Sequence, residues 1–588
     1  MRLFRHFYDL FYPLIIAVII GALAGLGAVA FRWLISFIIL NFQTVSTLLT
    51  EHAPAVTANI WIILLPALAG LIIGPIITFW APEVRGPGVP EVMEALALRS
   101  GHIRHRVTLI KSFVTAVLIA AGASVGREGP IVQIGSSIGS TLSRLLRLDH
   151  QKRRIAVVCG AAAGIAATFQ APMAGTLFAV EILLFDLETA FLSHIVIASV
   201  TGTLVARSCW DDPAIFHIPS FSLAHTGELA MYLGLGIAAG VLGVLLMKAI
   251  ITLPGVLKRL NIPLWLTPAA GGLLVGIIGF KRPETLGIGY ESISNALLGE
   301  ISLYFAAILV LTKIMTTCFS IGSGMSGGIF APALFIGAMT GTVFGHLAQL
   351  IWPDTILSSA HYALIGMGAM VSGVTLAPIT AIMTIFELTY NYEVILPLMV
   401  ACISSLLVVR IMHGYSIYED KLLQKGIDIS RGHEVNRLRN MLVKNFMIRD
   451  LNPLQVDDLL SEANDRMTKS DFPHFIVLDG EGRLAGVLTL RDLRNLRWDE
   501  NLEERTVEDL MQREVVTVEE EDSLETTFHI FSRNEFSFLP VVKKGRPDQV
   551  TGYLKRADII SAYDRHVLRE RALEPKGWGV PGSDKHRE

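Results

Sequence analysis

The sequence predicts an all-α polytopic membrane domain with broken, re-entrant helices, followed by a soluble α/β module. Three observations lead to this fold class. The 588 residues are 52% hydrophobic and 17% charged, whereas a soluble globular protein is typically about 25% charged. Apolar runs occupy the chain from Leu10 to about residue 412, and a charged, ordinary composition begins at about residue 419. Glycine- and proline-rich breaks interrupt the apolar part.

The first predicted element is a retained N-terminal helix. Its start is charged, but its apolar stretch is too long for a signal-peptide core and no clean small-residue cleavage site follows. A bilayer-spanning helix needs roughly 20 apolar residues. Runs of this kind lie at 12–31, 60–79, 233–253 and 392–412. Residues 127–144 are too short or too rich in glycine to cross the bilayer simply.

Charge and cysteine content narrow the class of protein further. The formal net charge of −3 gives no indication of a nucleic-acid partner. The basic cluster at 144–154 predicts a cytoplasmic loop by the positive-inside rule. The four cysteines are scattered, which argues against a disulfide framework or a zinc site, and we expect no bound metal. They are Cys159, Cys209, Cys318 and Cys402.

Glycine-rich breaks that start helices occur in both halves of the apolar part, at 85–93, 126–135 and 322–337. Lipid does not tolerate such backbone, so it lines a cavity or is buried in protein. A helix start carries unpaired N–H groups and the positive dipole end, which bind anions. Fixed partial charges also release a conducted ion more readily than a full cation does. Starts at 86–91, 128–131 and 328–331 therefore predict a site for one small inorganic anion.

Glu128 lies in the first turn of such a helix, where a carboxylate is favoured. Its carboxylate can occupy the place of an anion, and can leave when it is protonated or displaced. The alternative is a structural ion pair with Arg127. The flanking glycines and the repeated helix-start pattern favour a gate.

The charged C-terminal part contains an internal repeat. One copy lies at 474–496 and the other at 537–563. Each predicts a strand, a glycine-containing turn, a second strand and a helix that opens at Asp492 or Asp558. We expect the tail at 566–588 to be disordered.

These motifs together resemble the CLC family of chloride channels and chloride/proton antiporters. The matching segments are GPGVPEV (86–92), GREGP (126–130), GGIFAP (327–332), NYEVILPLMVACISSLL (391–407) and SIYEDKLL (416–423). The C-terminal repeat resembles the paired CBS domains of many members. The resemblance implies a membrane domain at 1–425, a linker at 426–445, and CBS domains at 446–500 and 505–565.

The resemblance also implies a multi-pass homodimer in a bacterial inner membrane. Each subunit has its own anion pathway and an inverted internal repeat, and the CBS module is cytoplasmic. Glu128 is then the external gate, and the backbone amides of Ile329 and Phe330 with the hydroxyl of Tyr418 hold the central anion. The full implied anion-binding set is Gly86, Pro87, Gly88, Glu128, Gly129, Ile329, Phe330 and Tyr418. For Tyr418, the alternative is an interfacial tyrosine.

Two positions depart from the family pattern. Pro87 stands where the common motif has serine, and proline supplies neither a hydroxyl nor an N–H. The same residue occurs in nitrate-favouring plant relatives, although proline is also well tolerated near a helix start. Ile182 stands where many antiporters have the internal proton glutamate, next to Glu181. We therefore expect a voltage- or pH-gated passive channel, with chloride/proton antiport as the alternative.

In the CBS repeat, Thr489 and Asp492 fit the pattern that holds the phosphate and ribose of an adenine nucleotide. The second copy retains Asp558 but has Lys555 in place of the hydroxyl. Nucleotide binding and a purely dimer-bracing role both remain open. No other cofactor is expected beyond the transported anion.

Two other classes of protein fit the sequence less well. A membrane enzyme needs a nucleophile–base arrangement or a pair of metal-binding histidines, and the apolar part contains no HExxH or comparable set. A CBS-regulated cation transporter needs acidic residues along its path. The helix starts favour anions, so the sequence predicts a transport protein for chloride or nitrate and not an enzyme.

Overall fold

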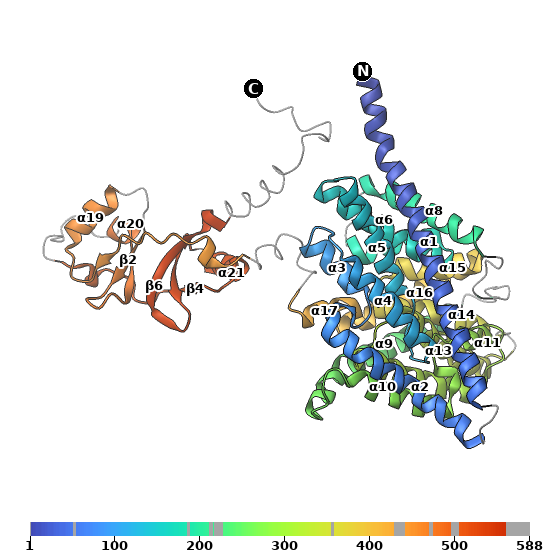
Figure 1. Ribbon diagram of the computed structural model, residues 1–588. Helices are drawn as coiled ribbons and strands as arrows, with labels where there is room; N and C mark the ends of the chain where they lie inside the picture. The colour runs from blue at the N-terminus through green and yellow to red at the C-terminus, as the bar shows by residue number, and fades with distance from the viewer. Residues whose placement is uncertain are drawn as a thin grey trace. The chain divides into compact units, whose positions relative to one another are not determined.

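A computed structural model describes residues 2–50, 55–184, 189–210, 216, 227–353, 358–427, 441–469, 474–494, 505–534 and 536–559. The chain divides into two compact units, Met1–Ile427 and Asp428–Glu588 (Figure 1). The predicted tail at 566–588 and most of the predicted linker at 426–445 lie outside the described residues.

The first unit is built from helices in two consecutive halves. The first half contains α1 (Arg2–Thr50), α2 (Ala55–Pro75), η1 (Ile76–Trp80), η2 (Pro82–Val84), α3 (Val89–Leu98), α4 (His105–Ala120), α5 (Glu128–Leu145), α6 (His150–Phe169), α7 (Pro172–Phe178), η3 (Ala179–Leu184) and α8 (Thr189–Ser208). The second half contains α9 (Glu228–Arg259), α10 (Thr267–Lys281), η4 (Pro283–Thr285), α11 (Tyr290–Leu297), α12 (Leu303–Gly322), α13 (Phe330–Ile351), α14 (Ser359–Thr375), α15 (Pro378–Thr389), η5 (Tyr392–Val394), α16 (Ile395–Met412) and α17 (Ile417–Gln424).

Among the described residues, seven helical segments are long and apolar enough to cross a membrane. The four runs expected from the sequence all lie within such segments. The remaining three are Phe191–Ser208, Leu303–Gly322 and Phe330–Ile351. The helices α3, α7 and α15 have only 10, 7 and 12 residues and begin at glycine- or proline-containing breaks.

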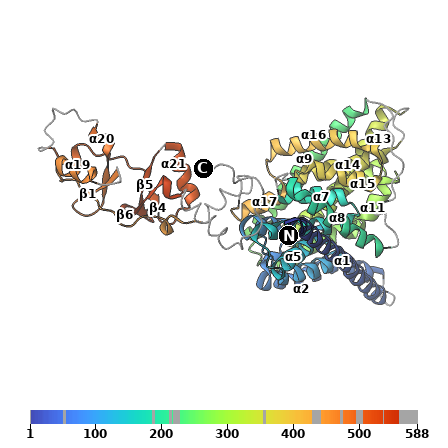
Figure 2. The same cartoon turned by 90° about the horizontal axis from the view of Figure 1, so that it is seen from above.

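Close backbone contacts at glycine pack these helices together. The views of Figures 1 and 2 agree that α9, α13, α14 and α16 lie side by side. A Cβ atom at Gly135 of α5 would lie 2.0 Å from the carbonyl oxygen of Gly160 in α6. At Gly337 of α13 it would lie 2.3 Å from the carbonyl oxygen of Gly366 in α14. Small residues at helix crossings are typical of membrane proteins, where the helices must be close to gain packing energy.

The two halves repeat the same local structures, as an internal repeat requires. In each half, a 3-10 turn that begins with Pro-Glu presents two carbonyl oxygens to the ammonium group of a fully buried lysine. The four distances between Nζ and oxygen are 2.9 to 3.0 Å. The lysines are Lys111, bound to Val84 and Gly86, and Lys313, bound to Thr285 and Gly287.

The halves also cap each other's short helices. The carboxylate of Glu387, near the end of α15, accepts the N–H groups of Met173 and Ala174 at the start of α7, at 2.9 and 2.7 Å. In return, Glu181 accepts the N–H groups of Ile379 and Thr380 at the start of α15, at 3.2 and 2.7 Å. Each helix start is thereby satisfied by a residue from the other half.

The second unit contains two small mixed sheets, each packed with helices. The first copy has β1 (Leu454–Gln455), α19 (Leu460–Thr468), β2 (His474–Leu478), β3 (Leu484–Thr489) and α20 (Leu490–Arg494). The second has β4 (Val518–Glu519), α21 (Leu524–Asn534), β5 (Phe538–Lys543) and β6 (Arg546–Lys555), and short turns η6 (Val443–Asn445) and η7 (Val507–Asp509) precede the two copies. The strand orders are β1-β2-β3 and β4-β5-β6, with the first pair parallel and the second antiparallel.

The segment before each copy packs on the other copy. Met441, Val443 and Met447 lie in the core of the second copy. Leu510 and Met511, which precede the second copy, pack against the core of the first. The N-terminal segment of each copy therefore contributes to the core of the other copy. Dividing the chain between the two copies would remove part of each core.

Candidate anion pathway

Two of the glycine-rich breaks meet directly at the centre of the first unit. The N–H of Gly126 donates to the carbonyl of Gly328 at 2.7 Å, and the N–H of Gly328 donates back to Gly126 at 2.7 Å. The two glycines are therefore a reciprocal pair at the starts of α5 and α13. This places residues far apart in sequence at one point.

The third break joins the same point. The N–H of Gly86 donates to the carbonyl of Met325 at 3.3 Å, and the N–H of Gly327 donates to the carbonyl of Gly86 at 3.3 Å. A Cβ atom at Gly129 would lie 1.8 Å from the carbonyl oxygen of Pro87. Only glycine at position 129 allows this approach, so the starts of α3, α5 and α13 converge as the sequence predicted.

No N-cap side chain closes its own helix start at these three helices. The N-cap residues of α3, α5 and α13 are Gly88, Arg127 and Ile329, and none of them makes a side-chain capping hydrogen bond. Gly88 has φ +92°, a conformation that favours glycine. The converging N–H groups are the donors that an anion needs, while Pro87 contributes no N–H. Ile329 and Phe330 are 1% and 3% exposed.

Glu128 extends over the glycine pair. A Cβ atom at Gly126 would lie 1.9 Å from Oε2 of Glu128, and one at Gly328 would lie 2.5 Å from the same oxygen. Glu128 is 2% exposed, and its carboxylate lies close to its own N–H and to the N–H of Ala331 in α13, without a well-formed hydrogen bond to either. The carboxylate therefore lies against N–H groups at the starts of α5 and α13, where an anion is favoured.

The guanidinium group of Arg127 lies over an aromatic ring, although its charge still acts on Glu128. Its guanidinium carbon lies 5.2 Å from the centre of the Tyr290 ring, a cation–π distance. Within the described part of the chain, no ion pair joins Arg127 to Glu128. The structural ion pair considered from the sequence is therefore not the arrangement found.

A cavity of about 790 Å³ opens beside the first and third helix starts. Gly86, Pro87 and Ile329 line it, and so does α17 through Ile417 and Lys421. Tyr418, the neighbour of Ile417, is 2% exposed. The structure thus brings α17 to the helix starts, and the buried Tyr418 hydroxyl is within electrostatic reach of Glu128.

The inner end of the expected proton route has no titratable side chain at Ile182, which is 3% exposed in η3. The adjacent Glu181 uses both oxygens to cap α15, with a further bond from the Thr380 hydroxyl at 2.7 Å. Glu181 is thus held as a structural carboxylate.

A second cavity, of about 950 Å³, lies in the second unit at Thr489 and Asp492. Oδ2 of Asp492 accepts the N–H and the hydroxyl of Thr489, at 2.9 and 2.5 Å. His474 and Phe538 stack in the cavity wall, with ring centroids 5.4 Å apart. Burial lowers the pKa of His474 below its ordinary value of 6.5. Asp558 does not line this cavity; its carboxylate accepts the N–H of Lys555 at 3.2 Å.

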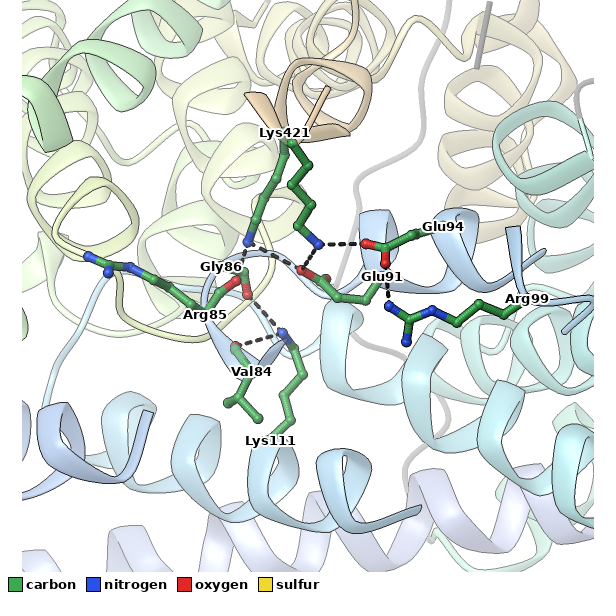
Figure 3. A network of polar contacts seen from close by, with 9 residues as sticks. Val84, Arg85, Gly86, Glu91, Glu94, Arg99, Lys111 and Lys421 are labelled. Carbon is green, nitrogen blue, oxygen red and sulfur yellow. Dashed lines mark hydrogen bonds and ion pairs between the residues drawn. The ribbon is translucent and has the colours of Figure 1, made fainter. Parts of the chain in front are cut away.

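Sequence reasoning missed Arg85, Glu91 and Lys421, which surround the first helix start. Nζ of Lys421 hydrogen-bonds the carbonyl oxygen of Arg85 and lies 3.3 Å from Oε1 of Glu91 (Figure 3). The Pro-Glu-x-x-Gly-x-Gly pattern at 82–88 and 283–289 was the available signal, because it identifies the repeated turns that these residues contact.

Comparison with known proteins identifies relatives of both units. Residues 69–410 match the family model described as voltage gated chloride channel, and residues 443–499 and 507–565 match the CBS domain. A putative chloride channel protein ClcB-like from Ralstonia nicotianae (strain ATCC BAA-1114 / GMI1000) is 35% identical over 373 residues, which cover 63% of this chain and 87% of the relative.

Two solved structures have the same fold. A slow cyanobacterial Cl⁻/H⁺ antiporter is 26% identical, with a TM-score of 0.64 over 70% of this chain and 97% of that chain. A eukaryotic CLC transporter is 20% identical, with a TM-score of 0.64 over 93% of this chain and 98% of that chain. The second likeness extends through both units and concerns the fold alone.

Proposed function

The chain belongs to the voltage gated chloride channel family, and on that premise we propose that Glu128 gates a chloride pathway at the starts of α3, α5 and α13. As a member of this family it is a multi-pass anion transport protein with two C-terminal CBS domains, and not an enzyme. Chloride is the proposed ion, and nitrate is the alternative that Pro87 favours.

One observation supports the gate above all others. The carboxylate of Glu128 lies against Gly126 and Gly328, where the helix starts converge, and close to the N–H groups of Glu128 itself and Ala331. A carboxylate in this place competes with an anion for the same positive dipole ends. Protonation removes the competing charge, so transport through this site depends on pH.

The test is anion efflux from proteoliposomes as a function of pH. Glu128→Gln mimics the protonated side chain, and we expect efflux that no longer depends on pH. Glu83→Gln is the matched control, because Glu83 is an exposed carboxylate paired with Arg104 at 3.4 Å. An unchanged pH dependence in folded Glu128→Gln protein contradicts the gate assignment.

Passive, voltage- or pH-gated conduction is the proposed mode of transport. A proton route needs a titratable group or water at its inner end, and Ile182 supplies none. Glu181 is engaged in capping α15 and is a poor substitute. Water can still bridge the gap. Proton-coupled exchange is the second candidate, and the 26% identity to a structure named as a Cl⁻/H⁺ antiporter favours it.

The reversal potential separates the two modes. Under a chloride gradient with an imposed pH gradient, a passive channel gives a potential set by chloride alone. A shift that follows the pH gradient indicates exchange through an unconventional inner path, and Glu181→Gln then tests whether Glu181 carries the proton.

Assembly and orientation form part of the same proposal. The capping carboxylates Glu181 and Glu387 are half-buried, and the side chains of Met173 and Ile379 beside them are 51% and 50% exposed. Polar groups of this kind are costly against lipid, so a second copy covering α7 and α15 is the proposed homodimer. The CBS module is placed in the cytoplasm of a bacterial cell, in line with the basic loop at 144–154.

Adenine nucleotide is the proposed ligand of the CBS cavity. The Thr489 hydroxyl and the Asp492 carboxylate suit phosphate and ribose groups, and the stacked rings of His474 and Phe538 offer a flat wall for a base. Direct titration of the full-length protein with ATP and AMP tests this proposal.

A further inference from the structure

Lys421 occupies the space left by a missing side chain at the first helix start. A Cβ atom at Gly86 would lie 2.1 Å from Nζ of Lys421, and Gly86 has φ +90°. The ammonium group hydrogen-bonds the Arg85 carbonyl and pairs with Glu91 at 3.3 Å (Figure 3). Lys421 thus reaches from α17 onto the loop that starts α3.

The Lys421 side chain also lines the cavity beside the first and third helix starts. Lys421, Gly86, Pro87 and Ile329 all line this cavity. The Lys421 side chain is 22% exposed, whereas that of its partner Glu91 is 9% exposed. Lys421 is therefore accessible to an ion that enters this cavity.

The number of donors also fits an anion site. Pro87 provides neither an N–H nor a hydroxyl, so this helix start lacks a donor. An ammonium group has three N–H donors. The contacts found for Lys421 in the described residues engage two of them, with Arg85 and Glu91. One donor remains at the turn where Gly86 precedes Pro87.

Lys111 and Lys313 provide an internal comparison. Each is fully buried and donates to two backbone carbonyls, so both act as structural braces. Among the described residues, Lys421 has no counterpart in the second half. Gly287 corresponds there to Gly86, and the nearest atom to a Cβ atom at Gly287 is the carbonyl oxygen of Ile119, 3.8 Å away. Lys421 is thus a residue that the two repeated turns do not share, and it lies at the turn that lines the cavity.

The charges around Lys421 allow the anion to be released. A bare ammonium group holds a small anion tightly, but Glu91 offsets this charge. Glu91 also lies 3.9 Å from Lys425, whose main partner is Glu94 at 2.7 Å, and Glu94 is in turn bound by Arg99 at 2.6 Å. Lys425 can therefore pair with Glu91 when an anion displaces the Glu91 carboxylate from Lys421.

We propose that Lys421 is a specificity-determining anion ligand at the cavity end of the pathway, where a chloride or nitrate ion exchanges with Glu91. The inference rests on the proposed anion transport and adds to it the donor that replaces the one missing at Pro87. The ion is a small monovalent inorganic anion for two reasons. The ammonium group offers a single free donor, and the loop at Gly86 leaves no room even for a Cβ atom beside it.

The test compares variants with opposite expected effects. Lys421→Met removes the ligand, and we expect the half-saturating chloride concentration to rise about tenfold, the factor that corresponds to about 1.4 kcal/mol. Lys421→Arg keeps a charged donor and is expected to restore most of the affinity. Glu91→Gln removes the competitor and is expected to lower the half-saturating concentration several-fold. If the Lys421–Glu91 ion pair were purely structural, Lys421→Met and Glu91→Gln would shift the half-saturating chloride concentration in the same direction.

The measurements are chloride efflux from proteoliposomes and calorimetric titration of the purified full-length protein with chloride, both at about 1 M ionic strength from an impermeant salt. At this ionic strength the Debye length is roughly 3 Å, so the long-range electrostatic effect of removing a charge is largely screened. Lys258→Met is the charge-matched control, because Lys258 lines the same cavity from α9. Unchanged affinity in Lys421→Met, or an equal loss in the control, overturns the inference. If Lys421→Met does not fold, weakened binding in Glu91→Gln overturns it instead. Absence of flux in the unmodified protein would instead reject the proposed function.

Discussion

Gly129→Ala is expected to separate the starts of α3 and α5 and to weaken anion binding. The added Cβ would lie 1.8 Å from the Pro87 carbonyl oxygen, and real Cβ contacts are essentially never under 3.0 Å. The two backbones must therefore part by at least 1.2 Å, the difference between 3.0 and 1.8 Å. Gly129 does not have a positive φ, so the effect comes from this contact and not from backbone strain.

The size of the effect follows from the range of a hydrogen bond. An amide that holds an anion at about 2.9 Å moves to about 4.1 Å, beyond hydrogen-bond distance. A hydrogen bond to a charged group contributes about 1.5–3 kcal/mol, and each 1.4 kcal/mol is tenfold. Anion affinity is expected to fall about tenfold to a hundredfold. The overpacking also costs about 1–3 kcal/mol of folding free energy.

The assay is chloride binding by calorimetry, with efflux from proteoliposomes and size-exclusion chromatography as checks on activity and folding. Gly255→Ala is the control, because nothing lies within 4 Å of a Cβ atom at that position in α9. It is expected to bind chloride normally and to gain up to about 1 kcal/mol of helix stability. Unchanged affinity in folded Gly129→Ala protein refutes the reasoning, as does an equal loss in the control.

Three further predictions concern both units. Pro87→Ser restores a donor at the first helix start and is expected to raise the ratio of chloride to nitrate flux; an identical ratio leaves Pro87 as a helix-start residue only. Asp492→Ala is expected to weaken ATP binding to the full-length protein at least tenfold, and retained affinity rejects the residue. Because burial lowers the pKa of His474, the unfolded chain binds more protons than the folded unit below pH about 6.5. The stability of the second unit should therefore fall as the pH drops below that value. In thermal unfolding experiments, the unfolding temperature of His474→Gln should depend less steeply on pH than that of the unmodified protein.

The class of fold and the helix starts were predictable because local rules govern them. Apolar run length placed four spanning segments. The breaks at 86–91, 128–131 and 328–331 marked where helices begin, and the structure confirms those starts at Val89, Glu128 and Phe330. The family indicated by GREGP and its companion motifs is confirmed by the match over 69–410.

The individual contacts between distant segments were not predictable, because they join residues roughly 200 to 340 positions apart in sequence. Nothing local to Gly126 indicates that it pairs with Gly328, and nothing in α17 indicates that Lys421 reaches Gly86. The local helix type at Ile182 was not predictable either. Residues 179–184 form a π-helix, which has more residues per turn than an α-helix, so Glu181 and Ile182 diverge by less than the roughly 100° typical of α-helical neighbours.

The reciprocal capping of α7 and α15 has a consequence for how the protein is made. Glu387 is 213 residues downstream of Ala174, and ribosomes add about 5–20 residues per second. The N–H groups at the start of α7 therefore lack their acceptor, Glu387, for roughly 10 to 40 s after they are synthesised. Over a similar time Glu181 lacks its donors at the start of α15. During biosynthesis the first half remains an incomplete insertion intermediate. Two fragments divided between α8 and α9 are accordingly expected to be degraded singly and rescued when they are co-expressed.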